Sequence, residues 1–96
     1  MLFRSHDLLV RAAEADRRGA ARRECPVTLA APDGPLLEGV VDLAFHDGAA
    51  WVVVDFKTDR DQDPARDAQY RHQVALYAAA IARATGQPAS GYLVRV

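Results

Sequence analysis

The sequence contains one cysteine, almost no net charge and no long hydrophobic run. The lone cysteine, Cys25, excludes a disulfide within the 96-residue chain and is typical of a reducing compartment. No apolar run approaches the roughly 18 residues of a membrane-spanning helix, so we expect a cytoplasmic protein without membrane contact. The net charge of −1 provides no overall basic field, and any contact with nucleic acid would depend on local clusters such as Arg22 and Arg23.

The sequence also has no internal repeat, no low-complexity tract and no G-x-x-x-x-G-K-[ST] motif. Without that phosphate-binding motif, these residues cannot themselves form an ATPase motor. A chain of this length is enough for one domain. We therefore assign residues 1–96 to a single domain, in which residues 1–21 form a helical lead-in. Because residues 93–96 have the pattern of an unfinished strand, we expect the chain to be a C-terminal fragment of a larger protein.

Hydrophobic periodicity and turn residues predict two helices and four strands. They are a helix over 5–18, strands over 24–31, 36–45 and 49–57, a helix over 65–85 and a strand over 92–96. The short turn with Asp47 and Gly48 joins the second and third strands as an antiparallel hairpin. A helix between the last two strands implies a crossover connection. The predicted fold is α/β, a mixed sheet flanked by helices in the order α-β-β-β-α-β.

Proline and glycine mark the ends of the predicted elements. Pro26 restricts the first strand to an edge of the sheet, or itself to the start of the strand, because proline cannot donate a ladder hydrogen bond. Residues 32–35 form a turn and residues 59–63 a loop. Pro64 suits the first position of the long helix, and Gly86 ends it. Its apolar stripe consists of Tyr70, Val74, Tyr77 and Ile81.

Two carboxylates interrupt apolar strands on either side of the hairpin turn. Asp42 lies within the second strand, and Asp55 lies in the third strand with Lys57 two residues later on the same face. Antiparallel pairing brings Asp42 and Asp55 within reach of each other, and a divalent cation such as Mg²⁺ or Mn²⁺ would allow both to stay ionised. The simpler alternative is a surface ion pair of Asp55 and Lys57 with Asp42 in a turn. The hairpin spacing of two acids within apolar strands favours the metal site.

Three segments in this order resemble the nuclease domain of RecB and AddA, which belongs to the PD-(D/E)XK superfamily. They are G-V-V-D at 39–42, V-D-F-K-T-D at 54–59 and Q-V-A-L-Y at 73–77, with Phe56 in place of the usual tyrosine. Each motif alone is weak, but the ordered set is specific, and the resemblance covers about residues 22–96. It implies a restriction-endonuclease-like core with the strand and helix order predicted above.

The resemblance also implies roles for individual residues. Asp42 and Asp55 would be ligands of Mg²⁺ or Mn²⁺, the backbone carbonyl of Phe56 would complete the metal shell, and Lys57 would be the catalytic lysine. In the residues themselves, two acids followed by a lysine agree with these roles, since carboxylates suit hard cations and an ammonium stabilises charge on a phosphoryl group.

Three further residues have two interpretations each. Gln73 and Tyr77 match the helix motif that borders the active site and either contacts DNA or braces the catalytic strand. Tyr77 also belongs to the apolar stripe and fits a core aromatic equally well. Glu24 corresponds in place to an acid on the first strand of the family, where it could be an outer ligand. As a single acid after two arginines, it fits a solvated position better.

A histidine on an upstream helix usually supplies another metal ligand in this family. The only upstream histidine here is His6, whose surroundings do not match the family motif. We expect His46, in the hairpin turn, and His72, on the long helix, to be exposed.

By the resemblance, the chain is a DNA exonuclease domain of an ATP-dependent, UvrD- and RecB-type helicase–nuclease in bacterial double-strand-break repair. Its partners would be linear DNA ends, single strands during unwinding, upstream helicase domains and a second helicase–nuclease subunit, at the nucleoid. The alternative is a decayed domain of the same fold that binds DNA or docks a subunit. A stand-alone restriction or repair nuclease is a third possibility that the Q-x-x-x-Y motif disfavours. The first helix has a thin apolar face, and a missing upstream helix would leave one side of the sheet uncovered, so we expect self-association through that side.

Overall fold

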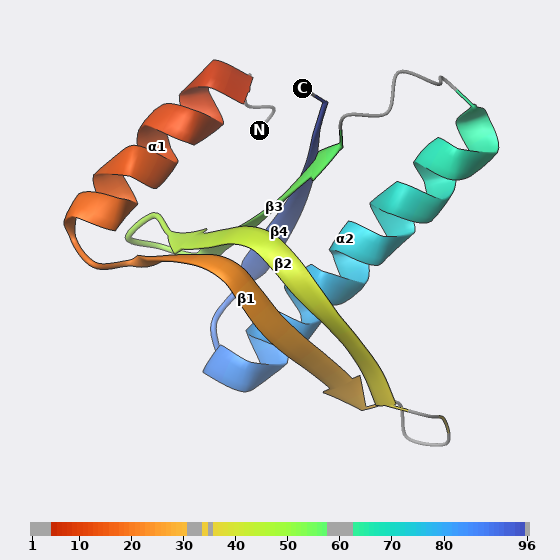
Figure 1. The fold of residues 1–96 in the computed structure, drawn as a ribbon. Helices are drawn as coiled ribbons and strands as arrows, with labels where there is room; N and C mark the ends of the chain where they lie inside the picture. Colours follow the sequence, from red (N-terminus) through yellow and green to blue (C-terminus); the bar gives the residue numbers. More distant parts are fainter. Residues whose placement is uncertain (1–4, 31–33, 35, 58–62, 96) are drawn as a thin grey trace.

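Two helices and a four-stranded sheet make up the fold (Figure 1). The computed structural model describes residues 5–30, 34, 36–57 and 63–95. The elements are α1 (Ser5–Arg17), β1 (Ala21–Ala30), β2 (Leu36–His46), β3 (Trp51–Lys57), α2 (Pro64–Thr85) and β4 (Ala89–Arg95). This is the predicted α-β-β-β-α-β order. No helix in the described part of the chain is both long and apolar enough to span a membrane.

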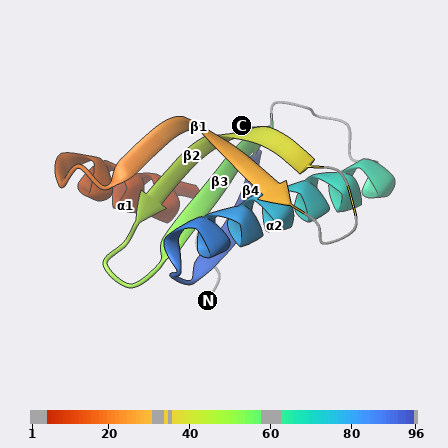
Figure 2. The same ribbon diagram turned by 90° about the horizontal axis from the view of Figure 1, so that it is seen from below.

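The sheet is mixed, as predicted, and its strand order is β1-β2-β3-β4. β2 is antiparallel to both β1 and β3, and α2 connects β3 to the parallel strand β4. β1 lies at an edge, which confirms the position inferred from Pro26. The helices lie on opposite faces of the sheet (Figures 1 and 2).

Each face of the sheet has its own hydrophobic core. The cluster under α1 consists of Leu8, Ala12, Ala15, Leu43, Phe45, Val52, Val54 and Val94. The cluster under α2 consists of Val41, Ala44, Val53, Val74, Ala78 and Ile81. Because α1 contributes only one large apolar side chain, its packing is thin, and Leu9 and Val10 remain exposed. Successive residues of β3 alternate between the two clusters, so Asp55 and Lys57 lie on the α2 face with Val53.

Helix α2 begins and ends where the sequence predicts. Asp63 precedes the first turn, and its Oδ1 accepts a hydrogen bond from Ala65 N at 3.0 Å. This N-cap satisfies one of the free amide groups of the first turn. At the other end Gly86 has φ 71° and donates its N–H to Ala82 O, a conformation that glycine adopts without strain.

Three strands begin at residues other than those predicted. β1 begins at Ala21 instead of residue 24, because Ala21 pairs with Phe45 of β2 and extends the ladder. β3 begins at Trp51, because Asp47 N donates to Ala50 O and the residues between them form the turn. β4 begins at Ala89, three residues before Tyr92, because pairing with β3 overrides the low strand preference of its small residues. The predicted turn at 32–35 and loop at 59–63 lie largely outside the described residues.

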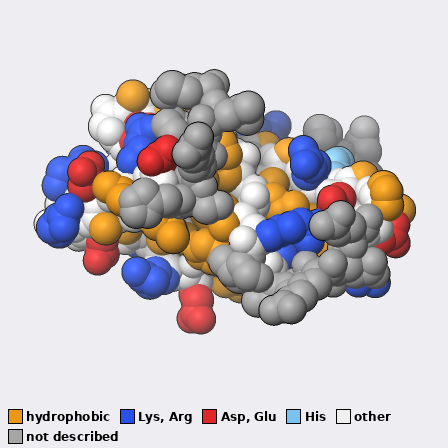
Figure 3. Space-filling model, turned by 90° about the horizontal axis from the view of Figure 1, so that it is seen from above, with side chains coloured by type: hydrophobic (Ala, Val, Ile, Leu, Met, Phe, Trp, Pro, Cys, Tyr) orange, Lys and Arg blue, Asp and Glu red, His pale blue; other side chains and the backbone are white. Residues whose placement is uncertain are grey.

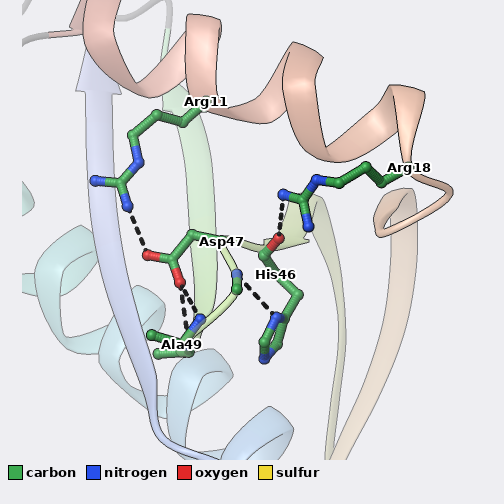
Figure 4. A network of polar contacts seen from close by, with 7 residues as sticks. Arg11, Arg18, His46, Asp47 and Ala49 are labelled. Carbon is green, nitrogen blue, oxygen red and sulfur yellow. Dashed lines mark hydrogen bonds and ion pairs between the residues drawn. The ribbon is translucent and has the colours of Figure 1, made fainter.

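The β2–β3 turn is tied to α1 by a polar network (Figure 4). Asp47 Oδ1 accepts hydrogen bonds from Ala49 N and Ala50 N, both at 2.9 Å, and its Oδ2 lies 2.7 Å from Arg11 Nη2. Arg18 Nη2 donates to His46 O at 3.3 Å. His46 is half-buried, against the prediction that it is exposed, because its ring packs edge-on against Trp51 across the hairpin.

Asp47→Ala is expected to lower the free energy of unfolding by about 2 kcal/mol at pH 7, because it removes two backbone hydrogen bonds and an ion pair. The amides of Ala49 and then Ala50 lower the pKa of Asp47, with a smaller contribution from Arg11. The stabilisation is therefore present above the ordinary Asp pKa of about 3.9 and lost as pH falls through the lowered pKa. Urea unfolding of both proteins between pH 7 and pH 2 measures the difference.

The control for this experiment is Asp16→Ala, which removes an exposed carboxylate of α1 and should change stability by less than about 0.5 kcal/mol. A difference between wild type and Asp47→Ala that stays constant across the acid range would contradict the role of the ionised carboxylate.

Candidate active site

Asp42 lies at an irregular point of the sheet. The β1–β2 ladder pairs Arg23 with Leu43 and Cys25 with Val41, and it leaves out Glu24 and Asp42 between them. Glu24 has φ 48°, which is unusual for a residue with a side chain. Val41 packs in the α2 cluster and Leu43 in the α1 cluster, so the alternation of faces reverses across Asp42. At this irregularity, Asp42 belongs to neither hydrophobic cluster.

β2 and β3 separate next to Asp42. Their ladder runs from His46 and Trp51 to Leu43 and Val54, and one further step would pair Asp42 with Asp55. At that step Asp42 Oδ2 accepts a hydrogen bond from Phe56 N at 2.8 Å. A carboxylate of β2 thus binds the backbone of β3 immediately after Asp55, and the two acids lie together as the hairpin spacing predicts.

Asp55 is the only charged or polar residue described as buried, at 4% exposure. Lys57 Nζ lies 3.0 Å from its Oδ2, but among the described residues this oxygen accepts no hydrogen bond of good geometry. Burial raises the pKa of the Asp55 carboxyl; Lys57 opposes this shift and the neighbouring Asp42 adds to it. A buried carboxylate beside a second acid is unfavourable unless another cation balances it.

The donor set fits a hard divalent cation. Asp55 Oδ2 is buried beside Lys57 and, among the described residues, accepts no hydrogen bond of good geometry. The Asp42 carboxylate is adjacent, and oxygen ligands are those that Mg²⁺ and Mn²⁺ prefer. In the described part of the chain, no three or more His, Cys, Asp or Glu residues are grouped so that they could hold a metal ion. Glu24 is exposed, and His6 lies in the first turn of α1 with its side chain outside the described residues.

Lys57 is the only lysine in the chain, and the other eleven of its 12 Lys and Arg residues are arginine. Its side chain is 23% exposed and ends beside Asp55. Lysine differs from arginine in carrying a compact charge with three rotatable donors. The single lysine thus places its ammonium beside Asp55, the acid that adjoins Asp42.

Comparison with protein families agrees with this arrangement. A family model of the PD-(D/E)XK nuclease superfamily matches residues 3–96. The chain belongs to this superfamily. The pattern in the superfamily's name fits Asp42 and the run Asp55-Phe56-Lys57, with Val41 where the pattern has proline. Nucleases of the PD-(D/E)XK superfamily typically use divalent metals. No curated protein matches the chain.

The superfamily match is coarser than the resemblance to RecB and AddA, whose distinguishing segment is the helix motif with Gln73 and Tyr77. Gln73 is exposed on α2, and Tyr77 is half-buried and packs against the α2 cluster. Both line a groove of about 190 Å³ between α2 and the far ends of β1 and β2. Tyr77 packs against the core, as one interpretation predicts, and it also borders an open groove. Its role at an active site stays a prediction. Thr58 and Asp59 lie outside the described residues.

Two contacts near the site were not predicted from the sequence. Lys57 Nζ lies 4.4 Å from the centroid of the Tyr70 ring, and Arg95 at the end of β4 forms an ion pair with Asp67 of α2. Tyr70 belongs to the predicted apolar stripe of α2, and this stripe was the only feature of the sequence that pointed to a buried contact of its ring. The position of a helix relative to strand ends depends on tertiary packing, which sequence periodicity does not specify.

The surface charge is mixed. On the face shown in Figure 3, the described Lys and Arg side chains lie in separate groups among hydrophobic and acidic ones. With a net charge of −1, DNA would have to be held by local contacts near the site and not by a general basic surface.

Proposed function

We propose that the chain is a divalent-metal-dependent DNA exonuclease domain that hydrolyses phosphodiester bonds. The observation that carries the proposal is the buried Asp55, with an oxygen that accepts no hydrogen bond from the described residues, beside Asp42 and 3.0 Å from Lys57. Such a charge cluster lowers fold stability unless it binds something. In a nuclease of this superfamily, the charge cluster would take part in phosphodiester hydrolysis.

In this proposal Asp42 and Asp55 hold Mg²⁺ or Mn²⁺, with the Phe56 carbonyl as a further donor. The bound cation would supply Lewis acidity toward the phosphodiester. Asp42 also fixes the Phe56 peptide through its 2.8 Å hydrogen bond, so the backbone between Asp55 and Lys57 is held rigidly. Lys57 stabilises the negative charge that develops on the phosphate. Gln73 and Tyr77 border the groove and either contact DNA or brace β2.

The ordered motifs support a finer proposal. G-x-x-D, D-F-K-T-D and Q-x-x-x-Y occur in the order found in RecB and AddA, and on that basis the chain is the nuclease domain of a helicase–nuclease in double-strand-break repair. Its partners would then be linear DNA ends, helicase domains and a second subunit, at the bacterial nucleoid. A decayed domain that only binds DNA or docks a subunit is the alternative, since the described residues contain no third His, Cys, Asp or Glu side chain grouped with the two acids.

Lys57→Ala is expected to lower the rate of linear DNA cleavage about 100-fold in the presence of Mg²⁺ or Mn²⁺, because it removes the charge that stabilises the phosphate. The matched control is Arg83→Ala, which removes one cation from the last turn of α2 and should retain the rate. Mg²⁺ titration should shift the amide resonances of Asp42, Asp55 and Phe56.

The same measurements separate the two functions. DNA binding with equal cleavage by wild type and Lys57→Ala would favour the decayed domain. Unchanged amide resonances at millimolar Mg²⁺ would count against any metal site at these acids.

A further inference from the structure

The side chain of Lys57 lies between a carboxylate and an aromatic ring. Its Nζ is 3.0 Å from Asp55 Oδ2 and 4.4 Å from the centroid of the Tyr70 ring. Tyr70 comes from the second turn of α2, whereas Asp55 and Lys57 come from β3. The charged end of the only lysine is thus contacted by two separate elements of the fold.

This arrangement matters because the neighbouring strand β2 does not direct the lysine. The β2–β3 ladder ends at Leu43 and Val54, so Lys57 has no paired neighbour on β2. A lysine side chain has many rotamers, and attraction to one carboxylate fixes its distance but not its direction. The face of an aromatic ring attracts the ammonium without taking up one particular N–H group. The donors of Lys57 therefore stay available for Asp55 and for a third group.

The ring itself is anchored close to the strand ends. Asp67 lies three residues before Tyr70, on the same side of α2, and forms an ion pair with Arg95. Arg95 of β4 is the register partner of Lys57 on β3. The first turns of α2 are consequently attached to the two adjacent strand ends, once through Asp67 and once through Tyr70.

We propose that Tyr70 is a positioning residue for Lys57, holding its ammonium at the two-carboxylate site through the face of its ring. This inference rests on the proposed nuclease function for its catalytic consequence, but the contact can be measured separately. It assigns to the second turn of α2 a role distinct from that of Gln73 and Tyr77, which border the groove further along the helix.

The test uses the 96-residue chain labelled with ¹³C at lysine Cε, where one lysine gives one unambiguous signal. The ring current of Tyr70 should move the ε-methylene protons upfield in the wild type and in Tyr70→Phe, which keeps the ring. Tyr70→Leu should return them to the position of a free lysine. Tyr92→Leu is the control, because it removes a half-buried tyrosine that packs on the α1 cluster, on the opposite face.

Cleavage kinetics test the consequence. Tyr70→Leu should lower kcat about tenfold with KM within about twofold, and Tyr70→Phe should retain kcat. In the Lys57→Ala background, Tyr70→Leu should have no further effect on the residual rate. An equal kcat loss in both backgrounds, or a Lys57 signal that does not move in Tyr70→Leu, would overturn the inference.

Failure of the proposed function has a different result, namely equal cleavage by wild type and Lys57→Ala. In that event the catalytic part of the inference falls with it. The lysine signal still decides whether Tyr70 holds Lys57.

Discussion

Asp55→Asn is expected to abolish metal-dependent cleavage and to leave the metal-free protein at least as stable as the wild type. Asparagine keeps the shape of the side chain and removes a buried charge that lies beside Asp42 and has an oxygen without a hydrogen bond from the described residues. Lys57 loses its ion-pair partner, but its side chain is 23% exposed and is not fully removed from water. The usual penalty for breaking a fully buried pair is therefore reduced.

The loss of function should be far larger than any change in stability. Removing a charged ligand from a hard cation that also contacts substrate is expected to lower cleavage at least about 1,000-fold. The urea midpoint in EDTA should not decrease, and the free energy of unfolding should stay equal or rise by up to about 1 kcal/mol. Parallel cleavage assays and urea titrations of the same preparations measure both quantities.

Metal binding gives a second readout that does not depend on catalysis. Mg²⁺ or Mn²⁺ at about 100 times its dissociation constant should stabilise the wild type by about 2.7 kcal/mol. A hundredfold weaker affinity in Asp55→Asn would reduce this gain to about 0.4 kcal/mol. Glu14→Gln, an exposed acid of α1, is the matched control and should keep the full gain. If Asp55→Asn were stabilised by metal as strongly as Glu14→Gln, Asp55 would not be a ligand.

The element order and the pairing of the two acids could be predicted because both depend on local signals. Asp47 and Gly48 fix the hairpin turn, and the antiparallel register then brings Asp42 and Asp55 together, one step beyond the last pair of Leu43 and Val54. Pro64 and Gly86 limit α2 for equally local reasons, through a fixed φ at one end and a left-handed φ of 71° at the other.

The irregular backbone at Glu24 could not be predicted in the same way. Strict alternation along β1 and β2 would place Val41 and Leu43 on one face, yet they lie in different cores. This reversal of the side-chain alternation depends on a joint distortion of β1 and β2, which pack against helices on opposite faces. No property of Glu24 or Asp42 alone indicates that the ladder omits them.

Contacts between distant elements were also beyond the sequence patterns. His46 was expected to be exposed because it lies in the hairpin turn, but it is half-buried, with its ring against Trp51 across the hairpin. Arg18, which follows α1, also donates to the backbone oxygen of His46. Tyr70 was identified as part of an apolar stripe, and the stripe does not show that one of its members ends over a lysine. Periodicity identifies which face of a helix is buried. Tertiary packing determines which side chains that face contacts.

Gly39→Ala is expected to destabilise the protein in the wild-type background and to become neutral or stabilising when Tyr77 is replaced by leucine. A Cβ at Gly39 would come within 2.6 Å of both Cε1 and Oη of Tyr77. The ring would have to shift, although it is half-buried against the α2 core. Overpacking of this kind costs about 1–3 kcal/mol.

Leucine lacks the ring atoms that meet Gly39, so Tyr77→Leu removes the clash. What remains is the ordinary gain from replacing glycine in a strand, about 0.4–1 kcal/mol, through the lower entropy of the unfolded chain. The coupling between the two positions in a double-mutant cycle should therefore exceed about 1 kcal/mol. Additive effects would show that Tyr77 does not pack on Gly39.

Gly91→Ala is the control for this cycle. Its Cβ would lie 2.9 Å from the backbone oxygen of Val74, a clash that Tyr77→Leu cannot relieve, so its effect should be the same in both backgrounds. Gly39 lies three residues before Asp42 on β2, and a displaced Tyr77 would push on the strand that carries this acid. Gly39→Ala should thus also lower cleavage, and Tyr77→Leu should restore part of it. The glycine of the first motif and the tyrosine of the third would then form one steric unit that sets the position of β2.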